Sequence, residues 1–237
     1  MMDVRRANER GQLRLDWLDS RYSFSFANWF EPTRMGVGPL RVINEDWVEP
    51  ATGFGQHGHR DMEILTWVLE GELEHADTLG QRSRLSAGHV QLMSAGTGIE
   101  HSEMNPSSDE RLHLLQIWIQ PDRKGLEPSY GEREVPAAQL DGRLALLASP
   151  DGASDSLRIA QDARVYASRL QPESAVELEL DAARQGYLHV ARGSVRVGEQ
   201  ELGAGDAVVL SQPGSVRVQT TQGAELLYFD LPEERAQ

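Results

Sequence analysis

The sequence contains no cysteine among its 237 residues. This absence excludes a disulfide framework, and it also excludes thiolates as nucleophiles or metal ligands. A chain without disulfides is compatible with a reducing compartment, and we expect a cytoplasmic protein.

Long apolar runs are also missing. No stretch of the sequence approaches the roughly 18 apolar residues that a membrane-spanning helix needs. The first residues, MMDVRRANERGQLRLDW, contain no apolar core of a signal peptide. We therefore expect no association with a membrane.

Positive charge is scarce, because 23 Lys and Arg face 37 Asp and Glu, for a net charge of −14. Such a balance opposes nonspecific binding to phosphate backbones, so we expect no direct contact with nucleic acid. An acidic surface would suit a basic protein partner better. The length allows one large or two smaller domains with ample core.

Two histidine-rich stretches stand out, GFGQHGHRDMEIL at 53–65 and GTGIEHSEMN at 96–105. His57 and His59 are separated by one residue, and so are His101 and Glu103. In an extended strand such pairs project to the same face. Three imidazoles and one carboxylate form a ligand set for a divalent first-row metal, and we predict a metal site at these four residues. The alternative is that they are surface side chains on glycine-rich loops.

Short alternating and apolar runs predict an all-β protein. SRYSFSFANWF at 20–30 alternates aromatic with small side chains, and LHLLQIWIQP at 112–121 is typical of a strand buried on both faces. Residues 122–161 are polar and rich in turn formers, with one short helix expected near 135–140. Strand patterns then resume at 163–170, 175–181, 187–198, 206–211, 215–221 and 224–231.

The two halves of the chain repeat one another. VLEGELEH at 68–75 aligns with HVARGSVRV at 189–197, which matches Gly71 with Gly193. SAGHVQLMSAGTG at 86–98 aligns with GAGDAVVLSQPGS at 203–215, which matches Gly88 with Gly205. A β-repeat of this kind predicts two small antiparallel barrels.

The second copy lacks the metal-binding pattern. Val218 and Thr220 stand at the positions of His101 and Glu103, and the first histidine pair aligns near Glu179 and Asp181. We therefore expect metal only in the first barrel. The expected organisation is a metal-binding domain over residues 1–130, a connection over 131–160 and a metal-free domain over 161–237.

Several longer motifs resemble those of the pirin family of bicupins, and within it the bacterial pirin-like proteins that cleave quercetin. They are SFSFANWF at 23–30, GPLRVINED at 38–46, HRDMEI at 59–64, SAGTGIEHSEMNP at 94–106 and LQIWIQP at 115–121. The resemblance covers essentially the whole chain. It implies two cupin barrels, each a double-stranded β-helix of jelly-roll type, and one divalent metal ion. Iron is the first expectation, with Zn, Ni, Co, Cu or Mn as alternatives.

One position departs from the pattern of many cupins, whose first motif supplies a glutamate five residues after the second histidine. Here that residue is Ile64, and Glu63 stands one residue early. As in pirins, the acidic ligand is then expected to be Glu103, which is also the candidate catalytic proton acceptor. Glu63 is the next candidate for that role.

The resemblance implies quercetin 2,3-dioxygenase activity, in which O2 opens the flavonol ring and carbon monoxide is released. The expected partners are a flavonol-like small molecule and O2, and the expected state is a monomer. Candidate walls of a flat apolar pocket are Phe24, Phe26, Trp29 and Met93. The other histidines are expected to be structural or on the surface; they are His75, His89, His113 and His189.

Two other functions fit the same residues. A pirin-like transcription cofactor would use the metal's oxidation state to shape a protein-binding surface. A metal-dependent sugar isomerase also uses the cupin fold and would need no O2.

Overall fold

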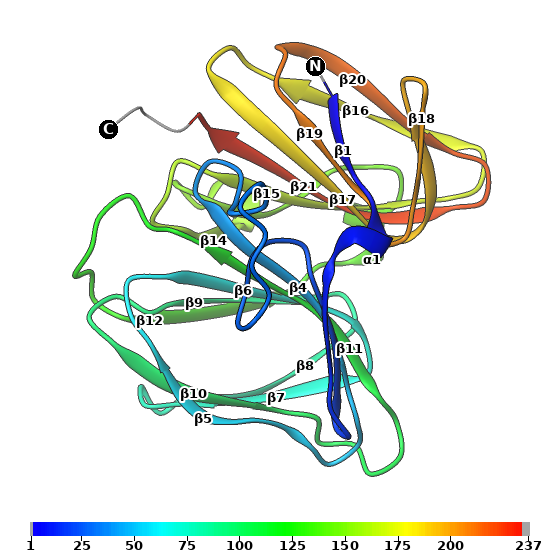
Figure 1. Cartoon of the computed structure of the whole chain (residues 1–237). Helices are drawn as coiled ribbons and strands as arrows, with labels where there is room; N and C mark the ends of the chain where they lie inside the picture. The colour runs from blue at the N-terminus through cyan, green and yellow to red at the C-terminus, as the bar shows by residue number, and fades with distance from the viewer. Residues whose placement is uncertain (1, 234–237) are drawn as a thin grey trace.

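The computed structural model describes residues 2–233, which form two β-barrel halves stacked on one another (Figure 1). The N-terminal half lies at the bottom of Figure 1 and the C-terminal half at the top. The predicted all-β architecture with two barrels is confirmed.

The N-terminal half is built from two sheets that face each other. One has the strand order β5 (Gly53–His59), β10 (Ile99–Met104), β7 (Glu72–Asp77), β8 (Arg82–Ser86). The other has the order β12 (Ser129–Glu134), β9 (His89–Ser94), β6 (Glu63–Glu70), β11 (Leu112–Ile119), β4 (Leu40–Val48), β3 (Leu18–Tyr22), β2 (Gly11–Arg14).

A single sheet forms the C-terminal half. Its main path runs β1 (Met2–Arg5), β19 (Ala207–Leu210), β17 (Arg184–Val197), β21 (Ala224–Pro232), β15 (Arg164–Leu170), β13 (Ala145–Ser149), β14 (Leu157–Arg158). Three more strands close the barrel from the long strand β17; they are β16 (Ser174–Leu180), β18 (Gln200–Gly203) and β20 (Gly214–Thr220).

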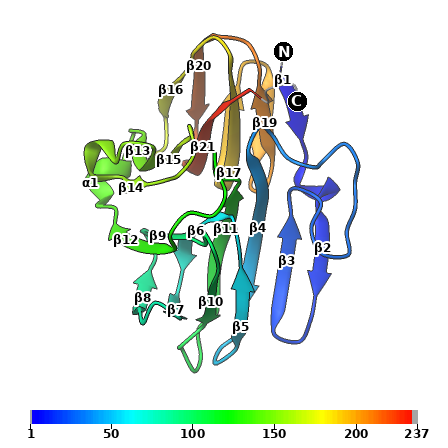
Figure 2. The ribbon, with the colours of Figure 1, turned by 90° about the vertical axis from the view of Figure 1, so that its left-hand side faces the viewer.

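The chain crosses between the halves at its start, because β1 pairs with β19 and β2 pairs with β3 (Figure 2). A 3₁₀ turn, η1 (Ala7–Glu9), lies between β1 and β2. The sequence patterns did not predict this crossing. The predicted domain boundaries stay a prediction.

The expected short helix near 135–140 is present as α1 (Ala137–Leu140), and a second 3₁₀ turn, η2 (Ala153–Asp155), follows it. Among residues 2–233 no helix has the length and hydrophobicity required to cross a membrane.

The strand predicted over 20–30 is wrong beyond Tyr22. Phe26 and Trp29 close a tight turn through two backbone hydrogen bonds of 3.1 and 3.0 Å. Ala27 inside that turn has φ 49°, a left-handed conformation that a strand cannot contain. The alternating pattern therefore continues past the point at which the backbone turns.

Strands β4, β6 and β11 are buried on both faces. On β6, Leu65, Trp67 and Leu69 belong to the core between the two halves, whereas Val68 points into the N-terminal barrel. The Trp67 indole N–H also donates to Glu225 Oε1 of β21 at 2.9 Å. The prediction that 112–121 is a doubly buried strand is confirmed for β11.

The glycine repeat recurs in the backbone. Gly71 and Gly193 have φ 76° and 74°, and Gly88 and Gly205 have φ 86° and 82°. A Cβ at Gly71 would lie 2.7 Å from the Arg111 carbonyl oxygen. Both the conformation and the close approach of a neighbouring strand therefore require glycine there.

We predict that Gly71→Ala destabilises the protein more than Gly80→Ala does. Both residues have left-handed φ, 76° and 87°, but no atom lies within 4 Å of a Cβ placed at Gly80. Gly80→Ala should therefore cost only the backbone strain, about 1–3 kcal/mol. Gly71→Ala should cost about 1–3 kcal/mol more from the steric overlap. Urea unfolding of both variants measures this, and equal losses would contradict it.

Candidate metal centre

The pairing of β5 with β10 places the first histidine pair beside the second motif. His57 and His101 are direct partners across the two strands. Their Nε2 atoms are 3.1 Å apart, and the ring centroids are 4.5 Å apart. The ring of His59 lies 4.9 Å from that of His101. The strand register therefore brings together imidazoles that are more than forty residues apart in sequence.

These three imidazoles form a set of potential ligands. One ring nitrogen from each of His57, His59 and His101 lies within 4.8 Å of the others. His59 Nε2 and His101 Nδ1 are buried without a hydrogen-bond partner. A buried polar atom without a hydrogen-bond partner is energetically costly. A metal ion would remove this cost by accepting the lone pair of such a nitrogen.

Burial keeps the rings of His59 and His101 neutral. Desolvation, with the neighbouring histidines adding repulsion, lowers the pKa of His101 to about 3 and the pKa of His59 to about 4. A metal ion binds only the unprotonated nitrogen of histidine. Both rings are therefore ready to bind a cation at neutral pH.

Glu103 is held from the opposite sheet. Its carboxylate accepts hydrogen bonds from Gln91 Nε2 at 2.7 Å, Gln116 Nε2 at 2.6 Å and Thr66 Oγ1 at 3.2 Å. The side chain is 1% exposed, and within residues 2–233 no Lys or Arg forms an ion pair with it. A buried carboxylate without a cationic side chain favours a bound metal ion.

A second acidic group inside the barrel responds to this charge. Burial, with the Glu103 charge adding to it, raises the pKa of Asp46 to about 7. The Ser20 hydroxyl donates a hydrogen bond to Asp46. Asp46 is therefore partly protonated near neutral pH.

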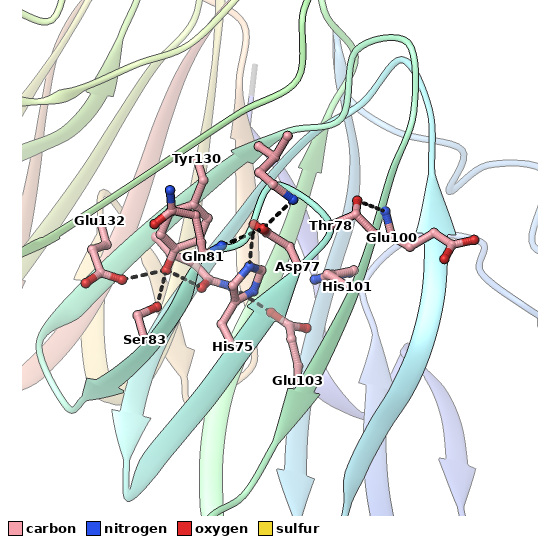
Figure 3. Close-up of polar contacts among 12 residues, drawn as sticks. His75, Asp77, Thr78, Gln81, Ser83, Glu100, His101, Glu103, Tyr130 and Glu132 are labelled. Carbon is pink, nitrogen blue, oxygen red and sulfur yellow. Dashed lines mark hydrogen bonds and ion pairs between the residues drawn. The ribbon is translucent and has the colours of Figure 1, made fainter.

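The four predicted ligands do not all fall into one compact group. His57, His59 and His101 form one group, and Glu103 forms another with His101 and His75. His75 was expected to be structural or on the surface, but it is fully buried and lies beside Glu103 in the β7–β10 pairing (Figure 3). The sequence signal that could have indicated it is the spacing His75-x-Asp77, the same i, i+2 pattern as in the two metal motifs.

Glu63 lies outside the metal centre, so its position gives no support to its role as the next candidate base. It accepts hydrogen bonds from Ser94 Oγ at 2.8 Å and the Ala160 N–H at 3.3 Å. Because side chains alternate along β6, Ile64 and Thr66 point into the barrel while Glu63 faces the other half.

The expected pocket walls have different environments. Phe24 belongs to the core between the halves, where its ring lies 5.4 Å from Tyr187. Met93 packs with Ile64 inside the barrel. The ring centroids of Phe26 and Trp118 are 5.4 Å apart, and those of Trp118 and His59 are 5.0 Å apart. Trp118 is therefore the aromatic residue beside the histidines, and sequence reasoning assigned it only to a buried strand.

The remaining histidines have other hydrogen-bond partners or lie between the two halves. His89 Nδ1 accepts from the Ser86 N–H at 2.7 Å, and His113 Nε2 contacts Glu45 at 3.0 Å. His189 is fully buried between the halves. None of these three belongs to the two histidine groups.

An open cleft reaches His59 from solvent. It encloses about 380 Å³ and is lined by Gly58, His59, Arg60, Thr78, Gly98, Ile99 and Glu100. Ligand clefts span roughly 300–1,000 Å³, so this one has room for a small molecule.

Comparison with known proteins identifies the family of the chain. Residues 3–119 match the family described as Pirin, and residues 146–231 match the Quercetinase C-terminal cupin domain. The chain is 44% identical to a quercetin 2,3-dioxygenase of Escherichia coli strain K12, over 98% of this chain and 99% of that protein. The chain belongs to the pirin family.

Solved pirin structures share the fold over their full length. Escherichia coli YhhW is 42% identical with a TM-score of 0.95, and the match covers 100% of both chains. The same bacterial pirin in complex with nickel(II) has a TM-score of 0.93 and 42% identity, and the match covers 99% of this chain and 100% of that one. A pirin-like protein of Caulobacter vibrioides is 38% identical, over 97% of this chain and 99% of that protein.

We predict that His101 makes the metal-free pirin fold acid-sensitive. Its pKa is about 3 in the folded state and about 6.5 when unfolded, so protons bind preferentially to the unfolded chain as pH falls below 6.5. The free energy of unfolding should drop by up to about 1.4 kcal/mol per pH unit between pH 6 and 4 from this residue. In chelator, His101→Asn should flatten the dependence measured by urea unfolding. Identical slopes would show that His101 is not responsible.

Proposed function

We propose that this pirin binds one divalent metal ion through His57, His59, His101 and Glu103 and opens the ring of quercetin-like flavonols with O2. The observation that carries the proposal is the buried Glu103 carboxylate, which forms no ion pair with a Lys or Arg among residues 2–233 and lies within 4.8 Å of ring nitrogens of His75 and His101. A relative named quercetin 2,3-dioxygenase and a related structure with nickel(II) support it.

The residues present fit the metal. The nitrogen and oxygen donors suit first-row divalent ions, and two of the imidazoles are neutral at physiological pH because burial lowers the pKa of His59 and of His101. Iron remains our first expectation for the native ion. When bound, the metal supplies Lewis acidity toward the flavonol 3-hydroxyl oxygen.

The side chains of the barrel then have separate tasks. Glu103 accepts the proton of the flavonol 3-hydroxyl, while Gln91 and Gln116 fix the carboxylate in position. The half-buried Trp118 offers an aromatic surface beside His59 for the flat rings. In the overall reaction O2 adds to the flavonol, the central ring opens, and one ring carbon leaves as carbon monoxide.

The competing function is that of a metal-bearing interaction protein, which would use the same metal ligands. The cleft beside His59 favours a small-molecule substrate over a purely regulatory metal, because it gives a small molecule access to one of the proposed ligands. We therefore place catalysis first.

We predict that metal-loaded protein consumes O2 when quercetin is added and that His57→Ala abolishes this turnover. His57 faces His101 directly, so its loss removes a nitrogen ligand from the centre of the cluster. His89→Ala is the matched control, because His89 belongs to neither histidine group. An oxygen electrode and carbon monoxide detection measure the reaction. No turnover by metal-replete wild type would favour the interaction protein, and turnover without O2 would contradict a dioxygenase.

Glu103→Gln tests whether this residue is a proton acceptor. With metal restored, the variant should bind quercetin but oxidise it about 100-fold more slowly, because a general base contributes about 10²–10⁴-fold. Raising the pH should partly restore the rate, since deprotonated flavonol needs no base.

The control for this variant is Gln116→Leu. It removes the 2.6 Å hydrogen bond to Glu103 and keeps the carboxylate, so it separates loss of positioning from loss of the base. Single-turnover rates with quercetin compare the two. If metal-replete Glu103→Gln reacts at the wild-type rate, Glu103 serves only as a ligand.

A further inference from the structure

His75 lies inside the N-terminal barrel, one strand away from the second metal motif. It is the direct partner of Glu103 in the β7–β10 pairing and is fully buried. Its ring stacks on the Tyr130 ring, with the ring centroids 4.6 Å apart, and its centroid lies 5.4 Å from that of the His101 ring. The proposed function gives this residue no role.

One ring nitrogen of His75 is fixed by an acidic neighbour. Its Nε2 lies 3.0 Å from Asp77 Oδ2 (Figure 3). The Asp77 side chain is fully buried, and its carboxylate accepts hydrogen bonds from the Leu79 and Gln81 N–H groups at 2.9 and 3.1 Å. A carboxylate that accepts the N–H of one ring nitrogen leaves the lone pair of the other nitrogen free, as in histidines that bind metals.

The free nitrogen has no other partner. His75 Nδ1 is buried and makes no hydrogen bond, and the same is true of His101 Nδ1. In Figure 3 the ring of His75 lies between the carboxylates of Asp77 and Glu103. One ligand atom from each of His75, His101 and Glu103 lies within 4.8 Å of the others.

We call His75, His101 and Glu103 the inner group and His57, His59 and His101 the outer group. The two groups differ in charge and in access to solvent. All three residues of the inner group are at most 1% exposed, whereas His57 and His59 are half-buried and His59 lines the cleft. The inner group also contains the carboxylate, which the outer group lacks. Two imidazoles and one carboxylate form a frequent ligand set for zinc and for non-haem iron.

We propose that the barrel holds a second, inner position for a divalent first-row metal, formed by His75, His101 and Glu103. The proposal builds on the metal site of the proposed function, with which it shares His101 and Glu103. Because the shared residues cannot serve two ions fully, one ion occupies either the outer or the inner position. Asp77 orients His75 toward the inner position.

The test uses the full-length protein and Co²⁺, with binding followed by visible absorption and metal analysis after dialysis. The starting variant is His57→Ala with His59→Ala, which removes two ligands of the outer position and none of the inner one. It should still bind close to one Co²⁺ per chain, more weakly than wild type. Adding His75→Asn should lower this affinity at least tenfold, and adding Asp77→Asn should lower it about 10–100-fold.

The matched control adds His89→Asn to the same starting variant and should leave Co²⁺ affinity unchanged. A second readout counts the bound histidines, because Co²⁺ shifts the N–H proton resonances of its histidine ligands in NMR spectra. The starting variant should show two such signals, one of them from the His75 Nε2–H. This readout needs no substitution at His75, so it remains valid if that variant fails to fold.

Two results would overturn the inner position. One is equal Co²⁺ affinity of the starting variant with and without His75→Asn; the other is the absence of a shifted His75 signal. Either result, with wild type still binding Co²⁺, leaves the outer site and the proposed function intact. Failure of wild type to bind any divalent metal would instead overturn the proposed function and the inner position together.

Discussion

The double burial of β4, β6 and β11 is the constraint on which both the assembly and the site depend. One face of these strands forms the core between the halves, with Leu65, Trp67 and Leu115 among its members. The other face carries Thr66 and Gln116, which donate hydrogen bonds to Glu103. A strand with side chains alternating between two buried faces has one permitted register, because a shift by one residue would exchange the two sets. The position of Glu103 is therefore coupled to the packing of the two halves.

The two barrels share a backbone pattern but have different interiors. In the C-terminal half, Val218, Leu178 and Leu180 belong to one apolar cluster. In the N-terminal half, the equivalent region contains histidines and Glu103, and amides from the facing sheet satisfy the carboxylate. Apolar filling stabilises a small barrel, whereas a polar interior requires a compensating ligand. This contrast explains why the proposed chemistry is concentrated in one half, which is open to solvent beside His59.

Charged groups are also buried where the chain crosses between the halves. Arg10 Nη1 donates to Glu45 Oε2 at 2.7 Å, and His113 contacts the other oxygen. Burial alone would raise the pKa of Glu45, but the hydrogen bond from His113 and the Arg10 charge lower it to about 2. Arg10 lies between η1 and β2, so this ion pair holds the crossing segment against the central sheet. Breaking a buried pair on one side would leave an uncompensated charge, which is strongly destabilising.

The sequence by itself determined the fold class, the repeated barrels and the pairs His57/His59 and His101/Glu103, because these depend on local periodicity and on turn glycines such as Gly71. It could not place β1 in the opposite half or end β3 at Tyr22, since pairing partners and turns in alternating segments are decided by distant contacts. Only the tertiary structure brought His75 and Asp77 beside Glu103 and Trp118 beside His59. A histidine's neighbours across a sheet depend on strand order and register, and neither is encoded in the spacing of residues along one strand.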